Sequence, residues 1–252
     1  MSDKLKQEYQ NKLGEEFGAV FHGLRNDWAW GLMRTKEFRE LFSNAEDVEL
    51  LNSISGGGFL WDIQHIFWDD LMLRVTRLTD PIRTAGKANL TVQGLPDFCT
   101  DPELCKEVRR LVGVAVDAAG FARDWRNQRI SHRDLTQAIS PNAEPLAPAN
   151  LRQVETALDA VHAILNVISE RLLDSSIAND IVIRPRTRAF VSYVKQLVEA
   201  VQYIDSFIDP SGNLRITDHG AASDFLQKLG YKPTMEKVKR IIELREAARR
   251  FK

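Results

Sequence analysis

The sequence is poor in cysteine and has no long uncharged apolar stretch, and each shortage excludes a class of protein. Its 252 residues include only two cysteines, Cys99 and Cys105, which lack the spacing and the partner histidines of a zinc site. We expect two half-buried thiols and no metal. A disulfide-rich secreted domain needs more cysteines, and neither an apolar N-terminal region nor a membrane-length span is visible. The composition therefore favours the cytoplasm, with no membrane contact.

Net charge is also small, at −1 with an isoelectric point near 6.5. This balance excludes a uniformly basic protein that coats nucleic acid by bulk electrostatics, so any phosphate contact must be local. Between Lys232 and Lys252, eight Lys or Arg residues stand against three Glu residues. This basic last segment is interpreted as a solvated helix face, with phosphate binding as the alternative.

Strand alternation is almost absent, whereas helical periodicity recurs along nearly the whole chain. The helix over residues 60–79 is apolar over so wide an arc that we place it at the centre of a bundle. We predict an all-α fold: an up-and-down helical bundle over residues 1–175, and a small, mainly helical extension over residues 176–252 with a basic last helix. The predicted helices cover residues 2–23, 26–42, 60–79, 92–98, 102–126, 151–172 and 190–208, with a possible strand at 214–217.

The segment DWRNQRISHRDL, residues 124–135, closes the long helix and has two interpretations. Its second half resembles the His-Arg-Asp-Leu of a protein kinase catalytic loop, but the metal-binding Asn expected four residues after Leu135 is Ile139. The chain also lacks the strand-borne Gly-rich loop and the Asp-Phe-Gly sequence that a kinase needs. The kinase interpretation therefore fails, and the Arg-Asn-x4-His frame of the first half remains.

Arginines give this helix end a strongly positive side, where the helix dipole also favours cations. Arg126 follows a stripe of alanines on the face expected to pack, and a cation there needs a partner. Taken singly, an ion pair within the bundle explains Arg126 well, with Asp69 or Asp70 as the candidate partner. The arginines that recur at spacings of three and four are Arg123, Arg126, Arg129 and Arg133.

A long helix ending in Arg-Asn-x4-His, after an apolar helix ending in Arg77-Leu78-Thr79-Asp80, resembles the HEPN superfamily. The ending Ile130-Ser131-His132-Arg133-Asp134 is most similar to the abortive-infection type U, or AbiU2-like, group. The resemblance covers roughly residues 1–175. It implies a helical bundle that dimerises and, in many members, a metal-independent endoribonuclease of phage defence or of a toxin-antitoxin system. Other members have lost cleavage and serve as binding or scaffold domains.

The residue types of the motif suit RNA cleavage by attack of the 2′-hydroxyl on the adjacent phosphate, without a cofactor. His132 can move protons near neutral pH, and Arg126 offers a planar, permanent cation to phosphate oxygens. Asn127 is expected to orient the phosphate or the local backbone, and Asp134 to hold the imidazole tautomer. The candidate RNA-binding side chains are Arg123, Arg129 and Arg133.

In an unbroken helix, Arg126 and His132 point about 120° apart and do not face one phosphate. Either the helix ends before His132, or two subunits share the site. We therefore expect a homodimer that binds an RNA substrate in a shared cleft, with an antitoxin protein as a further partner. The alternative is a catalytically silent, dimeric HEPN-like module that binds a partner protein or a nucleotide.

Other histidines and the tryptophans carry weaker signals. His65 and Asp69 lie four residues apart, but two ligands without a third predict a polar pair and no metal site. The helical spacing of four tryptophans predicts core positions rather than base-stacking platforms. These are Trp28, Trp30, Trp61 and Trp68.

Overall fold

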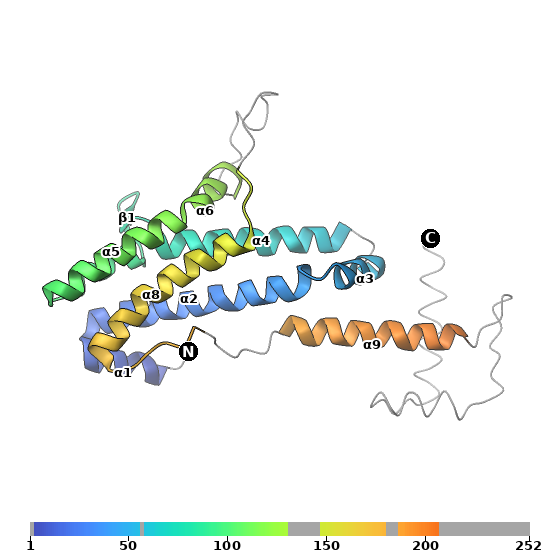
Figure 1. Cartoon of the computed structure of the whole chain (residues 1–252), viewed down its shortest axis with the longest axis horizontal. Helices are drawn as coiled ribbons and strands as arrows, with labels where there is room; N and C mark the ends of the chain where they lie inside the picture. Colours follow the sequence, from blue (N-terminus) through green and yellow to red (C-terminus); the bar gives the residue numbers. More distant parts are fainter. Residues whose placement is uncertain (1–2, 56–57, 131–146, 180–185, 207–252) are drawn as a thin grey trace, which may run out of the picture. The chain divides into compact units, whose positions relative to one another are not determined.

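The computed structural model describes residues 3–55, 58–130, 147–179 and 186–206, and this part of the chain is almost entirely helical (Figure 1). Its only strands form a short antiparallel hairpin, β1 (Arg83–Thr84) with β2 (Lys87–Ala88). The prediction of an all-α fold is confirmed. The helices are α1 (Asp3–Leu13), α2 (Glu15–Phe42), α3 (Ala45–Ser55), α4 (Gly58–Thr79), the 3-10 helix η1 (Val92–Phe98), α5 (Pro102–Ala118), α6 (Gly120–Trp125), the π-helical turn η2 (Arg126–Ile130), α8 (Leu151–Leu173) and α9 (Arg186–Ser206).

The chain divides into two units, residues 1–188 and 189–252. Helices α1 to α8 belong to the first unit, in which α2, α4 and α8 pack against one another and α5 lies along α8 (Figure 1). Most of α9 belongs to the second unit, where it is the predicted helix over residues 190–208. The predicted basic last helix and the strand at residues 214–217 lie outside the described residues.

The first two helices differ from the prediction at their junction. The chain turns at Gly14, which has a φ of +91°, a conformation that glycine adopts without strain. Helix α2 then runs without interruption through Gly23 and Asn26, so the predicted break between residues 23 and 26 is wrong. Helix α1 folds back closely onto α2, since a Cβ on Gly18 would lie 2.4 Å from the backbone nitrogen of Gln10.

Side-chain caps define the starts of three helices. Asp101 accepts hydrogen bonds from two amides in the first turn of α5, as its position before a proline predicted. Asn150 begins α8 with a reciprocal capping box, in which its side chain and that of Gln153 each accept from the other's backbone N–H. Helix α3 was not predicted, although Asn44 Oδ1 accepts from the Asp47 amide at 3.0 Å in the same way.

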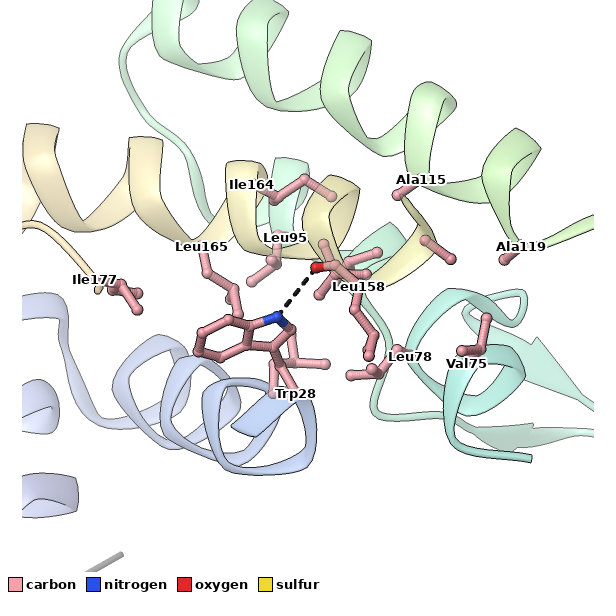
Figure 2. Close-up of a cluster of buried hydrophobic side chains, with 14 of the residues drawn as sticks. Trp28, Val75, Leu78, Leu95, Ala115, Ala119, Leu158, Ile164, Leu165 and Ile177 are labelled. Carbon is pink, nitrogen blue, oxygen red and sulfur yellow. Dashed lines mark hydrogen bonds between the residues drawn. The ribbon is translucent and has the colours of Figure 1, made fainter. Parts of the chain in front are cut away.

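The core of the first unit is built around Trp28 of α2, of which only 1% is exposed. Figure 2 shows its indole pointing toward α8, where Nε1 donates to the Leu158 carbonyl oxygen at 3.0 Å. Burying this N–H therefore leaves no unpaired donor. Helix α2 comes close to α8 at Gly31, where an added Cβ would lie 3.0 Å from Leu158 Cδ2. Side chains around the indole include Leu78, Leu95, Leu158, Leu165 and Ile177, with Ala115 and Ala119 farther along the cluster.

Helix α4 is central only in its C-terminal half. Leu71, Met72, Val75 and Leu78 are buried there, whereas Phe59, Trp61 and Ile66 near the N-terminus are each about 60% exposed. The prediction that the whole helix lies at the centre is therefore wrong, because these large apolar side chains of its first half are exposed. Of the tryptophans predicted to be core residues, Trp28 is buried, Trp68 is half-buried, and Trp30 and Trp61 are exposed.

Cys99 and Cys105 are both half-buried free thiols, as predicted. Each lies near a backbone carbonyl of η1, at 3.6 Å from sulfur to oxygen. Burial raises the pKa of the Cys99 thiol, with the neighbouring Cys105 adding to the effect. Among the described helices, none combines the length and the apolar character that crossing a membrane requires.

Candidate functional site

The long helix predicted over residues 102–126 is broken before the motif begins. Helix α5 ends at Ala118, and Ala119, with φ −89° and ψ 2°, leads into the short helix α6. Arg126 then opens the π-helical turn η2, a geometry found frequently at functional sites. Regular α-helical geometry thus stops at Trp125, and residues 126–130 follow π-helical geometry.

Arg126 makes an ion pair with Asp80, the residue that follows α4. Its Nη1 lies 2.6 Å from both carboxylate oxygens, and the two side chains are 23% and 15% exposed. The expected partners, Asp69 and Asp70, are therefore wrong for Arg126. Asp70 is bound instead by Arg74, at 2.7 Å, because that residue lies one turn further along α4. Asp80 is the last residue of the Arg77-Leu78-Thr79-Asp80 sequence and follows α4 directly. Its position in the sequence does not indicate which arginine it pairs with.

The Arg126 guanidinium is held on a second side by its neighbour. Its Nε donates to Asn127 Oδ1 at 3.1 Å. The two contacts use Nη1 and Nε, and within the described part of the chain no hydrogen bond engages the N–H groups of Nη2. The arrangement fixes the plane of the cation while leaving one edge for an anion.

Arg123 lies one turn earlier and is engaged with the protein. It donates through Nη1 to Thr79 Oγ1 at 3.3 Å and through Nη2 to the Val116 carbonyl oxygen. These bonds tie α6 to the end of α4, which places Asp80 beside Arg126. The geometry gives Arg123 a positioning task, and its predicted contact with RNA stays a prediction.

Arg129, on the other side of Arg126, is exposed and lies over an aromatic ring. Its guanidinium carbon is 5.3 Å from the centroid of the Trp125 ring, within the range of a cation–π contact. The Trp125 indole donates to the Ala147 carbonyl oxygen at 3.1 Å, which joins this turn to the segment before α8. Burial raises the pKa of the Asp69 carboxyl, and the charges of Arg129 and His65 oppose that rise.

Beside this turn lies a cavity of about 370 Å³, here called the α4–α8 hollow. It combines aromatic rings, uncharged amides and one arginine. The sequence analysis missed Trp125 and Phe38 as members of a site, because their neighbours come from separate helices. The residues that line the hollow are Phe38, Gln64, His65, Trp68, Trp125, Arg129, Ala149, Asn150 and Leu151.

The structure thus brings Arg123, Arg126, Asn127 and Arg129 together on α6 and η2. The predicted residues His132, Arg133 and Asp134 lie outside the described residues. Within the described ranges, no three His, Cys, Asp or Glu side chains lie close enough together to hold one metal ion.

A family model supports the resemblance seen in the motif. The model for AbiU2, of the HEPN_AbiU2 family, matches residues 14–202, which include the whole Arg-Asn-x4-His motif. The match starts and ends later than the segment 1–175 expected from the sequence, and it takes in most of α9. No curated protein and no solved structure matches the chain. On the match over residues 14–202, the chain belongs to the AbiU2 family of the HEPN superfamily.

Proposed function

We propose that this protein is a metal-independent endoribonuclease of HEPN type, acting in phage defence or in a toxin-antitoxin system. Membership of the abortive-infection AbiU2 family supports the biological setting. The observation that carries the chemistry is the held guanidinium of Arg126, which Asp80 and Asn127 fix from two sides. A cation fixed in advance stabilises developing charge without reorganising during the reaction.

In the proposed reaction, the 2′-hydroxyl of one nucleotide attacks its 3′ phosphorus atom. A bond forms from the 2′ oxygen to phosphorus as the bond from phosphorus to the 5′ oxygen breaks. The products are a 2′,3′-cyclic phosphate and a 5′-hydroxyl end. Arg126 stabilises charge on the phosphoryl oxygens, and His132 moves the proton of the attacking or the leaving oxygen.

Arg126 is accessible enough to take part in this reaction. Its side chain is 23% exposed, and within the described residues Nη2 donates no hydrogen bond. Asp80 reduces the net charge of the site, but it also prevents the long side chain from sampling other rotamers. The Arg126 side chain is therefore already ordered before RNA binds, so binding costs less side-chain conformational entropy.

The active form in this proposal is a homodimer, in which the ends of two long helices meet across a two-fold axis. The small residues Ala115, Ala119 and Ala122 are all buried within the first unit. They are therefore used in packing the unit itself, and the dimer rests on the family resemblance. An antitoxin protein is a proposed further partner.

A second candidate function is a catalytically silent module that binds a partner protein or a nucleotide. One observation favours it: Asp80 already neutralises the Nη1 edge of Arg126, so the ion pair is complete without any substrate. A structural ion pair of this kind needs no role for His132.

The test is cleavage of a fluorescent single-stranded RNA by the purified full chain in buffer containing EDTA. We expect cleavage that survives the chelator and leaves a 2′,3′-cyclic phosphate, and we expect His132→Ala to slow it by about 10²-fold or more. If activity disappears with EDTA and returns with a divalent ion, the metal-free mechanism is wrong. If His132→Ala cleaves at the wild-type rate, the binding module becomes the better account.

A further inference from the structure

We propose that the α4–α8 hollow binds a nucleobase of the strand whose phosphate lies at Arg126. The proposal rests on the proposed function for the choice of ligand, and its evidence is the chemistry of the hollow. A volume of about 370 Å³ falls within the roughly 300–1,000 Å³ of small-molecule sites. Apolar rings lined with a few polar groups are the usual composition of such sites.

Aromatic surface is the first feature that fits a base. Trp68 and Trp125 meet edge to face, with ring centroids 6.1 Å apart and planes at 79°. Phe38 packs against Trp68 from α2 at 5.6 Å. Two rings at this angle form a corner, in which a planar ligand can stack on one ring and touch the edge of the other. Stacking on aromatic rings is the common means by which proteins hold unpaired bases.

Arg129 adds a charged, planar surface to the same hollow. Its guanidinium lies over the Trp125 ring at 5.3 Å, and the side chain is exposed. Bases stack on arginine planes as well as on aromatic rings, and the cation also attracts phosphate. Arg129 follows Arg126 by three residues, so both cations lie on the short turn η2.

Amide groups supply the means to recognise the edge of a base. Gln64 lines the hollow, and within the described part of the chain no hydrogen bond engages its amide. Asn150 presents its side chain from the start of α8, with Oδ1 used by the helix cap. No Asp or Glu is among the lining residues, so the lining itself carries no negative charge, and the nearest acidic side chain with a known effect is Asp69, which interacts with Arg129 and His65.

The chemistry favours a base over a peptide side chain. A site for an acidic or basic peptide needs charges of the opposite sign to orient the peptide. Aromatic rings with neutral amides instead match the flat, uncharged bases. The cation on the rim lies on the same turn as Arg126, which suits a ligand that carries phosphate beside its ring. These features select a single-stranded nucleic acid.

The test is equilibrium binding of two labelled oligonucleotides that cannot be cleaved because they lack the 2′-hydroxyl. One carries thymine bases and the other has abasic positions on the same backbone. We expect the full chain to prefer the base-containing strand by about tenfold or more, and Trp68→Leu to lose most of this preference. Trp30→Leu is the matched control, since Trp30 is an exposed tryptophan of α2 outside the hollow.

Gln64→Ala provides a second variant if Trp68→Leu folds poorly, because no hydrogen bond within the described chain depends on the Gln64 amide. It should weaken the preference for bases by about threefold while leaving the abasic strand unaffected. Equal binding of the two strands by the wild-type chain, or an unchanged preference in both Trp68→Leu and Gln64→Ala, overturns the proposal. This binding assay does not depend on cleavage. If the wild-type chain prefers the base-containing strand but does not cleave RNA in the cleavage assay, the ribonuclease function is wrong and the base site stands.

Discussion

The Trp28 core and the Arg126 site meet at the C-terminal end of α4, yet they follow different physical rules. Leu78 is 2% exposed and belongs to the core, and two residues later the Asp80 side chain is 15% exposed and holds a cation. Around Trp28, apolar side chains surround one satisfied N–H donor. Around Arg126, charged groups remain within reach of solvent and are paired with one another. A residue of the stabilising core and a residue of the candidate site therefore lie two positions apart at the end of α4.

The largest expected effect of a mutation is a loss of stability at Trp28, in the core. Trp28→Ala should lower the free energy of unfolding by about 3–5 kcal/mol, because it leaves a cavity between α2 and α8 and removes the bond to Leu158. Trp28→Phe should cost less, since it keeps most of the apolar volume. Urea denaturation of the full chain measures both. A loss below about 1 kcal/mol for Trp28→Ala would mean that this region is not the stabilising core.

Backbone packing beside the core gives the next effect. Gly18→Ala should destabilise the protein by about 1–3 kcal/mol, because the new Cβ would meet the backbone of Gln10 at 2.4 Å. Gly113→Ala is the matched control, since no atom lies within 4 Å of its added Cβ and alanine is the better helix former. It should raise stability by about 0.5–1 kcal/mol. Similar melting temperatures for the two variants would contradict the close approach of α1 to α2.

The Arg126 site should respond to mutation in activity more than in stability. Asp80→Asn keeps the size of the side chain and weakens its hold on Arg126, so we expect RNA cleavage to fall by about tenfold. The free energy of unfolding should change by about 1 kcal/mol or less, because both side chains are partly exposed. Kinetics and urea denaturation on the same preparation give the two numbers. A drop in stability with unchanged kinetics would make Asp80 a purely structural residue.

The smallest effect concerns Asp69, whose pKa burial raises in the folded protein. A carboxyl with a raised folded pKa favours folding most fully when protonated, below its unfolded pKa of about 3.9, and this contribution is lost as pH rises through the folded pKa. Asp69→Asn should therefore be slightly more stable than wild type at pH 7, by about 0.5 kcal/mol or less. The difference should shrink toward pH 3. Lower stability of the variant at pH 7 would show that attraction to Arg129 outweighs burial.

Sequence periodicity predicted most of the helices, because an amphipathic stripe reports which face is buried, but it missed α3. It predicted the caps at Asp101 and the end of α4 at Thr79, since local chemistry sets both. It failed at Gly14 and at Ala119, where tertiary packing decides whether a helix continues. A stripe also does not say which helix will cover it, and so Trp30 and Trp61 were wrongly placed in the core.

For the site, the motif identified Arg126 and Asn127, which the structure holds in contact. The predicted partner of Arg126 was wrong because Asp69, Asp70 and Asp80 all lie on or next to α4. Which of them Arg126 meets depends on how α6 packs against α4, and sequence spacing does not give that. The α4–α8 hollow was not predicted, because its walls come from α2, α4, α6, η2 and the start of α8. Sequence spacing relates residues within one helix and carries no such information between helices.

The most direct test of the account is a double-mutant cycle on RNA cleavage with Arg126→Ala, His132→Ala and the combined variant. If the two side chains act in one transition state, each single change should reduce the rate by about 10²-fold or more. The double variant should then lose less than the product of the two. Arg126→Lys should recover little activity, because lysine keeps the charge but loses the planar fork that Asp80 and Asn127 hold. Strictly multiplicative losses, or wild-type cleavage by His132→Ala, would contradict a shared catalytic site.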